Sequence, residues 1–120
     1  ADHKGIENIA YSIRDLAERT RNNDNDPEDF QDATFTVSSL GSIAGQTFTP
    51  ILNPPEVGIL GIGEIKQRPR YHDGELVNAH VVHLSITIDH QVIDGADGAR
   101  FLKTLRETLA SPRELFPLQI

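Results

Sequence analysis

The stretch Asp89-His90-Gln91-Val92-Ile93-Asp94-Gly95 joins two segments of different periodicity, and those segments decide the fold. Before it, the even positions from Val82 to Ile88 are apolar and the odd positions are polar. This alternation predicts one long strand over Leu76–Asp89, and a regular pleat would bring His90 out on the apolar, buried face. After it, apolar residues recur at helical spacing over Gly98–Ala110, which predicts an amphipathic helix.

The histidine and the carboxylate within this stretch allow two interpretations. In the first, His90 is a polar strand end and Asp94 caps the next helix through its side chain. In the second, the imidazole is a general base that takes a proton from an alcohol or a thiol. A span of five residues does not by itself bring the carboxylate of Asp94 to the imidazole, so the local pattern leaves both interpretations open.

The remaining periodicity predicts a small α+β domain. An apolar stripe indicates a helix over Gly5–Asn22, and Asp73-Gly74 is typical of a hairpin turn between Arg68–Tyr71 and Leu76 onward. Further elements are predicted as a turn and two strands, at Pro27–Phe30, Thr34–Ser38 and Val57–Ile65. The expected fold class is a two-layer sandwich of a mixed β-sheet with helices on one face.

Composition excludes several classes of function. The chain has 120 residues, of which 38% are hydrophobic and 24% charged, as in an ordinary globular domain or part of one. Its net charge of −7 disfavours nucleic acid and anionic lipid as partners. No apolar stretch is long enough to cross a membrane, and the absence of cysteine excludes disulfides and thiolate metal sites.

Two other patterns suggest ligand sites but are better explained by structure. His80 and His83 are three residues apart. On one strand this spacing directs the two rings to opposite faces, so we do not expect them to bind one metal ion together. Gly58, Gly61 and Gly63 lie within an apolar strand pattern and do not form a phosphate-binding motif before a helix. Close backbone packing is the better account of these glycines.

Three passages together resemble a known family. They are Thr34-Phe35-Thr36-Val37-Ser38-Ser39-Leu40-Gly41, the run from Phe48-Thr49-Pro50-Ile51-Leu52-Asn53-Pro54-Pro55-Glu56-Val57 to Gly63, and Leu84–Leu105 with its His-x-x-x-Asp-Gly motif. Their order and spacing resemble the catalytic core of the dihydrolipoamide acyltransferases of 2-oxoacid dehydrogenase complexes. This core belongs to a superfamily that includes chloramphenicol acetyltransferase. The resemblance implies a chloramphenicol acetyltransferase-like fold and acyl transfer, most simply of acetyl, between dihydrolipoamide and coenzyme A.

The resemblance also implies roles for individual residues. His90 matches the catalytic histidine that deprotonates the thiol, and Ser38 matches the serine that donates a hydrogen bond to the tetrahedral oxyanion. Asp94 matches the acidic position of the motif, where the carboxylate serves geometry by pairing with an arginine from the first half of the domain. Phe48 and Leu60 are candidates for lining a substrate channel, although core packing explains them equally well. Position 91 departs from the family pattern, with glutamine in place of arginine.

The expected organisation is that of a partial domain. Residues 1–120 match the C-terminal half of the catalytic domain, and the lipoyl and peripheral-subunit-binding domains are absent, so the chain alone is expected to be inactive. Coenzyme A would be a substrate, the lipoyl group would come on a separate domain, and no metal is needed. The implied assembly is a homotrimer that builds a larger core, with decarboxylase and dihydrolipoamide dehydrogenase components as partners and no nucleic acid or membrane.

Several alternatives remain open at this point. The half-domain could be a non-catalytic structural or assembly module, motivated by the missing first half. The acyl group that is transferred could be of the branched-chain type. A third alternative, ranked lower, is that the acyl group is transferred to an alcohol, as in chloramphenicol acetyltransferase. The resemblance implies a cytoplasmic location in a bacterium and the mitochondrial matrix in a eukaryote.

Overall fold

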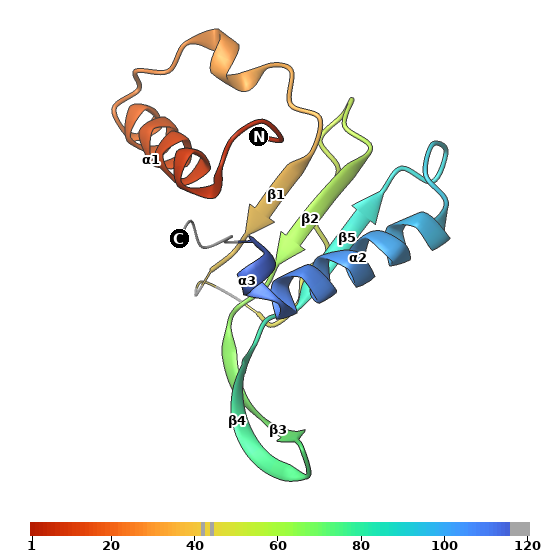
Figure 1. Cartoon of the computed structure of the whole chain (residues 1–120). Coiled ribbons are helices and arrows are strands. Elements are labelled where there is room, and N and C mark those ends of the chain that lie inside the picture. Colours follow the sequence, from red (N-terminus) through yellow and green to blue (C-terminus); the bar gives the residue numbers. More distant parts are fainter. Residues whose placement is uncertain (42, 44, 116–120) are drawn as a thin grey trace. The chain divides into compact units, whose positions relative to one another are not determined.

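The computed structural model describes residues 1–41, 43 and 45–115 (Figure 1). The chain forms two compact units, Ala1–Ala33 and Thr34–Ile120, and each is described here by itself. In the described residues, no helix combines the length and the apolar character that a membrane span requires.

The first unit contains helix α1 (Ile6–Arg21) and the short 3₁₀ helix η1 (Pro27–Phe30), close to the predicted bounds. Arg19 holds the two together, because its guanidinium donates to both carboxylate oxygens of Asp29 at 2.6 and 3.1 Å. A third bond joins Arg19 to Asp15 at 3.2 Å. The hydrogen bond from Arg19 lowers the pKa of Asp29 below its usual value and raises that of the guanidinium.

The second unit is built on a three-stranded mixed sheet in the order β1-β2-β5 (Figure 1). Strand β1 (Thr36–Ser39) runs parallel to β2 (Gly58–Ile62), and β2 runs antiparallel to β5 (Leu84–Ile88). The mixed sheet expected from the sequence is therefore confirmed. Among the described residues, the buried apolar side chains are Ile59 and Leu60 of the central strand.

A two-stranded arm extends from this sheet. Strands β3 (Lys66–His72) and β4 (Glu75–Val81) pair antiparallel around the predicted turn, where Asp73 and Gly74 both have positive φ. The prediction of one continuous strand over Leu76–Asp89 is wrong, because β4 ends at Val81 and β5 begins at Leu84. The two strands belong to different sheets, and an alternating pattern cannot reveal that the hydrogen-bonding partner changes from β3 to β2 between them.

Helix α2 (Gly95–Ala110) packs against one face of the sheet, and the short helix α3 (Pro112–Leu115) follows it (Figure 1). The helix begins three residues earlier than predicted. Asp94 takes the N-cap position with extended backbone, and its carbonyl accepts the amides of Asp97 and Gly98 at 3.0 and 3.2 Å. The expected capping bond from the Asp94 side chain is not made, so this part of the first interpretation is wrong.

The opposite face of the sheet carries the extended segment around Phe48 to Pro50. Ser85 donates to the carbonyl of Phe48 at 2.7 Å, and Thr87 donates to that of Pro50 at 2.6 Å. The polar positions of β5 therefore hold a covering segment in place. A Cβ on Gly61 would lie 2.5 Å from the Ser85 hydroxyl oxygen, which confirms that close packing explains this glycine.

Candidate active site

His90 lies in the turn that follows β5, and its side chain is exposed. The prediction that a regular pleat would bury it is wrong, because the strand ends at Ile88 and the chain turns before the histidine. Asp89 organises this turn. Its amide donates to the carbonyl of Val57 at 2.9 Å, and its carboxylate accepts the amide of Gln91 at 2.9 Å.

The backbone carbonyl of Asp89 completes the turn by accepting the amides of Val92 and Ile93 at 3.0 and 2.9 Å. The turn thus holds the backbone of His90 between the end of β5 and the start of α2. We did not predict a role for Asp89 from the sequence. The signal was available, since an aspartate commonly accepts the amide two residues later at the start of a turn.

Asp94 and Gly95 lie beside His90 at the N-terminus of α2. The Nε2 atom of the imidazole is 3.9 Å from the position that a Cβ on Gly95 would occupy, so the ring extends over the first residue of the helix. Asp94 is exposed. Among the described contacts, its carboxylate makes no hydrogen bond or ion pair with the imidazole.

Ser38 is half-buried on the edge strand β1, which β2 separates from β5 in the sheet. The register aligns Ser38 with Gly61 of β2, and Gly61 with Ser85 of β5. From Ser85 the strand continues to its end at Ile88, about 10 Å away, and His90 follows in the turn beyond that end. The two predicted catalytic residues therefore lie toward opposite ends of the sheet, and one copy of the chain does not bring them together.

Phe48 and Leu60 contact opposite faces of the sheet. The Phe48 ring lies 3.1 Å from the Cβ position of Gly61, on the face that the covering segment occupies. Leu60 is adjacent to Gly61 and pairs with Ile86, so its side chain points to the face that carries α2. The two residues do not line one common channel, and a role for either of them in binding substrate stays a prediction.

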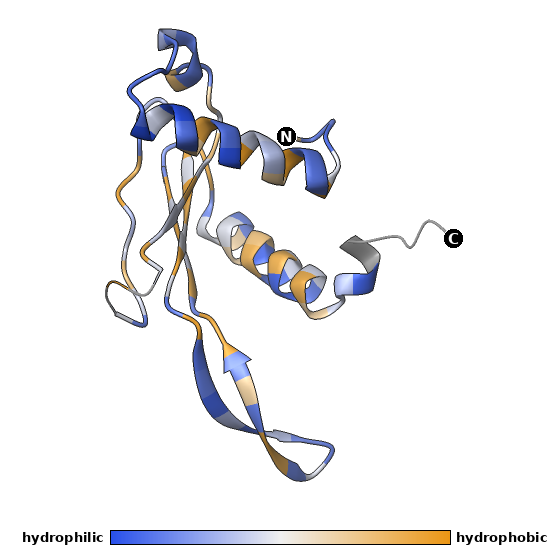
Figure 2. Ribbon diagram, turned by 90° about the vertical axis from the view of Figure 1, so that its left-hand side faces the viewer, coloured by the Kyte–Doolittle hydropathy of each residue, from blue (hydrophilic) through white to orange (hydrophobic). Residues whose placement is uncertain are grey.

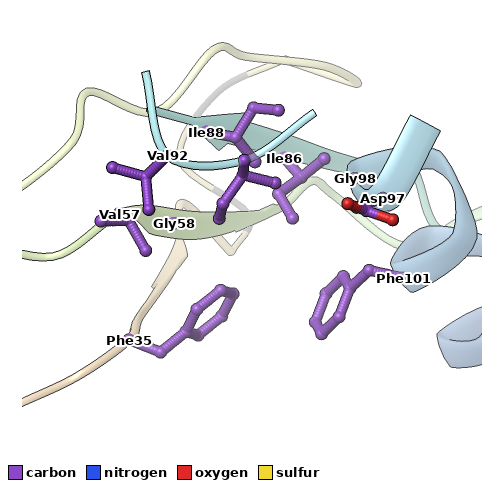
Figure 3. A pocket seen from close by; sticks show the side chains of 10 residues that line it. Phe35, Val57, Gly58, Ile86, Ile88, Val92, Asp97, Gly98 and Phe101 are labelled. Atoms are coloured by element: carbon purple, nitrogen blue, oxygen red, sulfur yellow. The ribbon is translucent and has the colours of Figure 1, made fainter. Parts of the chain in front are cut away.

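An apolar cavity of about 380 Å³ lies between the sheet, the turn that carries His90 and helix α2 (Figure 3). Phe35 and Phe101 line this cavity with ring centroids 5.6 Å apart, and Figure 3 shows the two rings next to one another on one side of the strands. The turn contributes Val92 and Ile93. Phe101 is one of the apolar residues that recur at helical spacing over Gly98–Ala110, but no sequence signal indicates that Phe35 would meet it.

No cluster in the described residues has the three or more ligating side chains that a metal ion requires. His80 lies on β4 and contacts Gln67 at 3.4 Å, whereas His83 lies in the link between β4 and β5. The strand argument used for this pair does not apply as stated, since only one of the two histidines is on a strand.

Comparison with known proteins identifies the family. Residues 1–117 match the family described as 2-oxoacid dehydrogenases acyltransferase (catalytic domain). Dihydrolipoyllysine-residue acetyltransferase components of pyruvate dehydrogenase complexes from Staphylococcus epidermidis and Staphylococcus aureus are both 44% identical over 115 residues. These matches cover 96% of the chain but 27% of the length of the relatives.

Solved structures give the same result. Dihydrolipoamide acetyltransferase of Azotobacter vinelandii is 42% identical with a TM-score of 0.87, over 95% of this chain and 47% of that one. A probable dihydrolipoamide acetyltransferase of Listeria monocytogenes is 33% identical, also with a TM-score of 0.87, over 92% and 47% of the two chains. The chain thus spans about half the length of these solved chains, and its α+β fold is the chloramphenicol acetyltransferase-like fold of such cores.

The Azotobacter vinelandii structure was solved to investigate a serine, a histidine and an asparagine in the catalytic mechanism of that enzyme. The interval between that serine and histidine equals the interval between Ser38 and His90. The asparagine follows the histidine at the same distance as Asp94 follows His90, so this chain has a carboxylate where that enzyme has an amide. By sequence, by fold and over nearly all of its length, this chain belongs to the 2-oxoacid dehydrogenase acyltransferase family and matches its catalytic domain.

Proposed function

We propose that this chain supplies the C-terminal half of a catalytic domain that moves an acetyl group between dihydrolipoamide and coenzyme A. The observation that carries the proposal is the exposed imidazole of His90 on a turn fixed by Asp89, at the spacing from Ser38 that the Azotobacter vinelandii enzyme shares. Coenzyme A and the lipoyl group are substrates in this proposal, and the chemistry requires no metal.

The reaction follows from the chemistry of the two side chains. His90 accepts the proton of the attacking thiol, and the resulting thiolate adds to the carbonyl carbon of the acyl thioester. Ser38 donates a hydrogen bond to the oxyanion that forms, a contribution of about 3 kcal/mol to lowering the barrier. Collapse of the tetrahedral intermediate breaks the original carbon–sulfur bond, and the imidazolium returns its proton to the departing thiolate.

The distance between Ser38 and His90 supports an active site shared between copies. Ser38 lies toward one end of the sheet and His90 lies beyond the other end, so one chain does not hold a single thioester against both side chains. A ring of copies, of which a homotrimer is the simplest that the family resemblance suggests, could supply the histidine from one subunit and the serine from its neighbour. Larger cores and the decarboxylase and dihydrolipoamide dehydrogenase partners belong to the same proposal.

The small number of buried apolar side chains supports the proposal that this chain is part of a larger domain. Ile59 and Leu60 are the buried apolar side chains among the described residues, whereas Val37 on the edge strand is 57% exposed. A sheet with so little buried apolar surface gains little hydrophobic stabilisation by itself. The first half of the domain would cover such surface and would supply the partner of Asp94.

Acetyl transfer from acetyl-coenzyme A to dihydrolipoamide, measured with the intact parent protein, tests the roles of both residues. His90→Ala should lower kcat by about 10²–10⁴-fold, and Ser38→Ala by about 10²–10³-fold. His72→Ala at the tip of the arm and Ser39→Ala, whose side chain points to the other face of β1, are matched controls. A fully active His90→Ala protein would refute the proposal.

Complementation tests whether the site is shared. Assemblies reconstituted from equal amounts of His90→Ala and Ser38→Ala subunits should regain activity, because up to about a quarter of shared sites would receive both intact side chains. Each variant reconstituted alone provides the baseline. Complete absence of recovery in mixed assemblies of normal size would contradict a site built from two subunits.

A second candidate function is a non-catalytic assembly module, favoured by the failure of one chain to bring Ser38 to His90. It predicts that the purified 120-residue chain forms oligomers without catalysing acetyl transfer. Turnover by that chain alone would count against it. The same substrate assay with branched-chain acyl-coenzyme A distinguishes the acetyl specificity proposed above from a branched-chain one.

A further inference from the structure

Glu56 is the buried charged residue among those that the structure describes. Figure 2 shows runs of hydrophilic residues along the helices and the β3–β4 arm, where charged side chains are at least partly exposed. Glu56, in contrast, is 7% exposed and lies just before β2. Within the described part of the chain, no basic side chain forms an ion pair with its carboxyl group. Burying such a group costs free energy unless hydrogen bonds compensate it.

The carboxyl group of Glu56 accepts hydrogen bonds from two side chains. The Thr36 hydroxyl of β1 donates to Oε2 at 2.5 Å, and the Asn53 amide makes a longer contact of 3.5 Å with Oε1. The backbone amide of Glu56 also donates to the carbonyl of Asn53 at 3.0 Å, which closes a turn. Pro54 and Pro55 occupy the centre of this turn, and their rings fix φ at both positions. A rigid turn therefore presents the carboxyl group to β1.

Thr36 shares its face of β1 with Ser38. Both residues are half-buried and lie two positions apart, so their side chains point to the same side at a spacing of about 6.6 Å. In the described sheet, β1 is an edge strand of four residues with β2 as its hydrogen-bonding neighbour. None of the hydrogen bonds of the described residues uses the Ser38 hydroxyl, so the position of this hydroxyl depends on where β1 lies.

The bond between Thr36 and Glu56 fixes the position of β1 on β2. The register places Ser38 beside Gly61 of β2. A slip of β1 by one residue would turn Ser38 to the other face of the sheet, and a slip by two residues would move it by about 6.6 Å. Either slip would separate the Thr36 hydroxyl from the carboxyl group of Glu56.

We propose that Glu56 is a positioning residue for acyl transfer, which acts through Thr36 to hold Ser38 where its hydroxyl can donate to the oxyanion. This inference rests on the role proposed above for Ser38. An oxyanion donor stabilises the transition state only when it lies within hydrogen-bond distance of the developing charge. Misplacement of β1 should therefore lower kcat and leave KM nearly unchanged, because the lost bond is made in the transition state and not to the bound substrate.

A second route leads from the same segment toward His90. The carbonyl of Val57, the residue after Glu56, accepts the amide of Asp89 at 2.9 Å, and Asp89 organises the turn of the histidine. A change at Glu56 could therefore reach either candidate residue. The two routes are separable, because an effect that passes through Ser38 disappears once the Ser38 hydroxyl has been removed.

Acetyl transfer from acetyl-coenzyme A to dihydrolipoamide by the intact parent protein tests the proposal. Glu56→Ala and Thr36→Val should each lower kcat by about tenfold with little change in KM, a smaller loss than that expected for Ser38→Ala. Glu56→Gln keeps an acceptor oxygen and Thr36→Ser keeps a hydroxyl, so both should stay within about twofold of the wild type. In the Ser38→Ala background, Glu56→Ala should lower kcat by less than about twofold.

Thr87→Val is the matched control. It removes from β5 a half-buried hydroxyl that lies on the same face of the sheet as Thr36 and donates to the carbonyl of Pro50 at 2.6 Å. Any effect of Thr87→Val on kcat should be equal in the wild-type and Ser38→Ala backgrounds. Hydrogen–deuterium exchange in a peptide that covers β1 should become faster in Glu56→Ala but not in Thr87→Val. Thr36→Val, which nearly keeps the side-chain volume, provides the same test if Glu56→Ala does not assemble.

The possible results separate this inference from the proposed function. Wild-type kcat in Glu56→Ala and Thr36→Val, together with an impaired Ser38→Ala, would overturn the inference and leave the proposed function intact. An equal loss with and without the Ser38 hydroxyl would also overturn it, because Glu56 would then act through the turn of His90 or through stability alone. Wild-type activity of Ser38→Ala would refute the oxyanion role itself, and the inference would fail with it.

Discussion

Replacing Gly61 by alanine should destabilise the second unit through a defined steric conflict. The new Cβ would stand 2.5 Å from the Ser85 hydroxyl oxygen, 3.1 Å from the Phe48 ring and 3.2 Å from Pro50. Ser85 would have to rotate and give up its 2.7 Å bond to the carbonyl of Phe48. Overpacking costs about 1–3 kcal/mol and the lost bond about 1 kcal/mol, against a gain of about 0.5–1 kcal/mol for replacing glycine in a strand. The net loss in the free energy of unfolding should be about 2 kcal/mol.

A double-mutant cycle isolates the steric part of this loss. Ser85→Ala alone loses the hydrogen bond, about 1 kcal/mol, but it also removes the oxygen that Gly61→Ala would strike. The double variant should therefore be about 1 kcal/mol more stable than the sum of the two single losses predicts. Urea unfolding followed by circular dichroism measures all three variants.

Gly95→Ala is the matched control for the cycle. Its Cβ would meet only the Nε2 atom of His90, at an ordinary contact distance of 3.9 Å, and alanine favours a helix more than glycine does. This variant should be at least as stable as the wild type. If Gly61→Ala proved as stable as Gly95→Ala, or if the losses in the cycle were additive, the close packing of the covering segment on β2 would not have the energetic role assigned to it.

Three further outcomes are expected. Asp89→Ala should lower kcat of the parent protein with little change in KM, because the turn that holds the histidine loses the carboxylate that accepts the amide of Gln91. Asp89→Asn keeps an acceptor oxygen and should restore most of the rate, and equal defects in the two variants would argue against this positioning role. The contact between Asp29 and Arg19 lowers the pKa of the carboxyl, so it stabilises the first unit above the unfolded-state pKa and is lost as the pH falls through the lower, folded-state value. An acid titration of the helical circular dichroism signal should therefore lose its acidic step in Asp29→Asn, and an unchanged profile would contradict the pairing. Thr87→Val should cost about 1 kcal/mol in urea unfolding, since the hydroxyl that donates to Pro50 is removed at nearly constant volume; no loss would mean that water replaces this bond.

The elements that the sequence predicted well depend on neighbours along the chain. The apolar stripe of α1 repeats every three to four residues, and the Asp73-Gly74 pair accepts the positive φ angles of a tight turn. Both signals depend only on residues a few positions apart in the chain, so they do not depend on the tertiary structure. The catalytic candidates His90 and Ser38 came from motif spacing, which is likewise a property of the chain alone.

The elements that the sequence predicted poorly depend on distant partners. The apolar positions over Leu76–Asp89 change from odd in β4 (Val77, Ala79, Val81) to even in β5 (Leu84, Ile86, Ile88), which marks a break but not the partner of either strand. Only the ladders show that β4 pairs with β3 and β5 with β2. The early start of α2 follows from the backbone carbonyl of Asp94, a group that every residue has and that no sequence pattern distinguishes.

The sequence by itself determined the local elements, the close packing of Gly61 and the family to which the chain belongs. Only the tertiary structure decided that Ser38 and His90 lie toward opposite ends of one sheet, and that Phe35 and Phe101 line one cavity. The physical reason is that periodicity records which face of an element is apolar. The order and register of strands are set by hydrogen bonds between segments far apart in the chain, and these determine which side chains share a site.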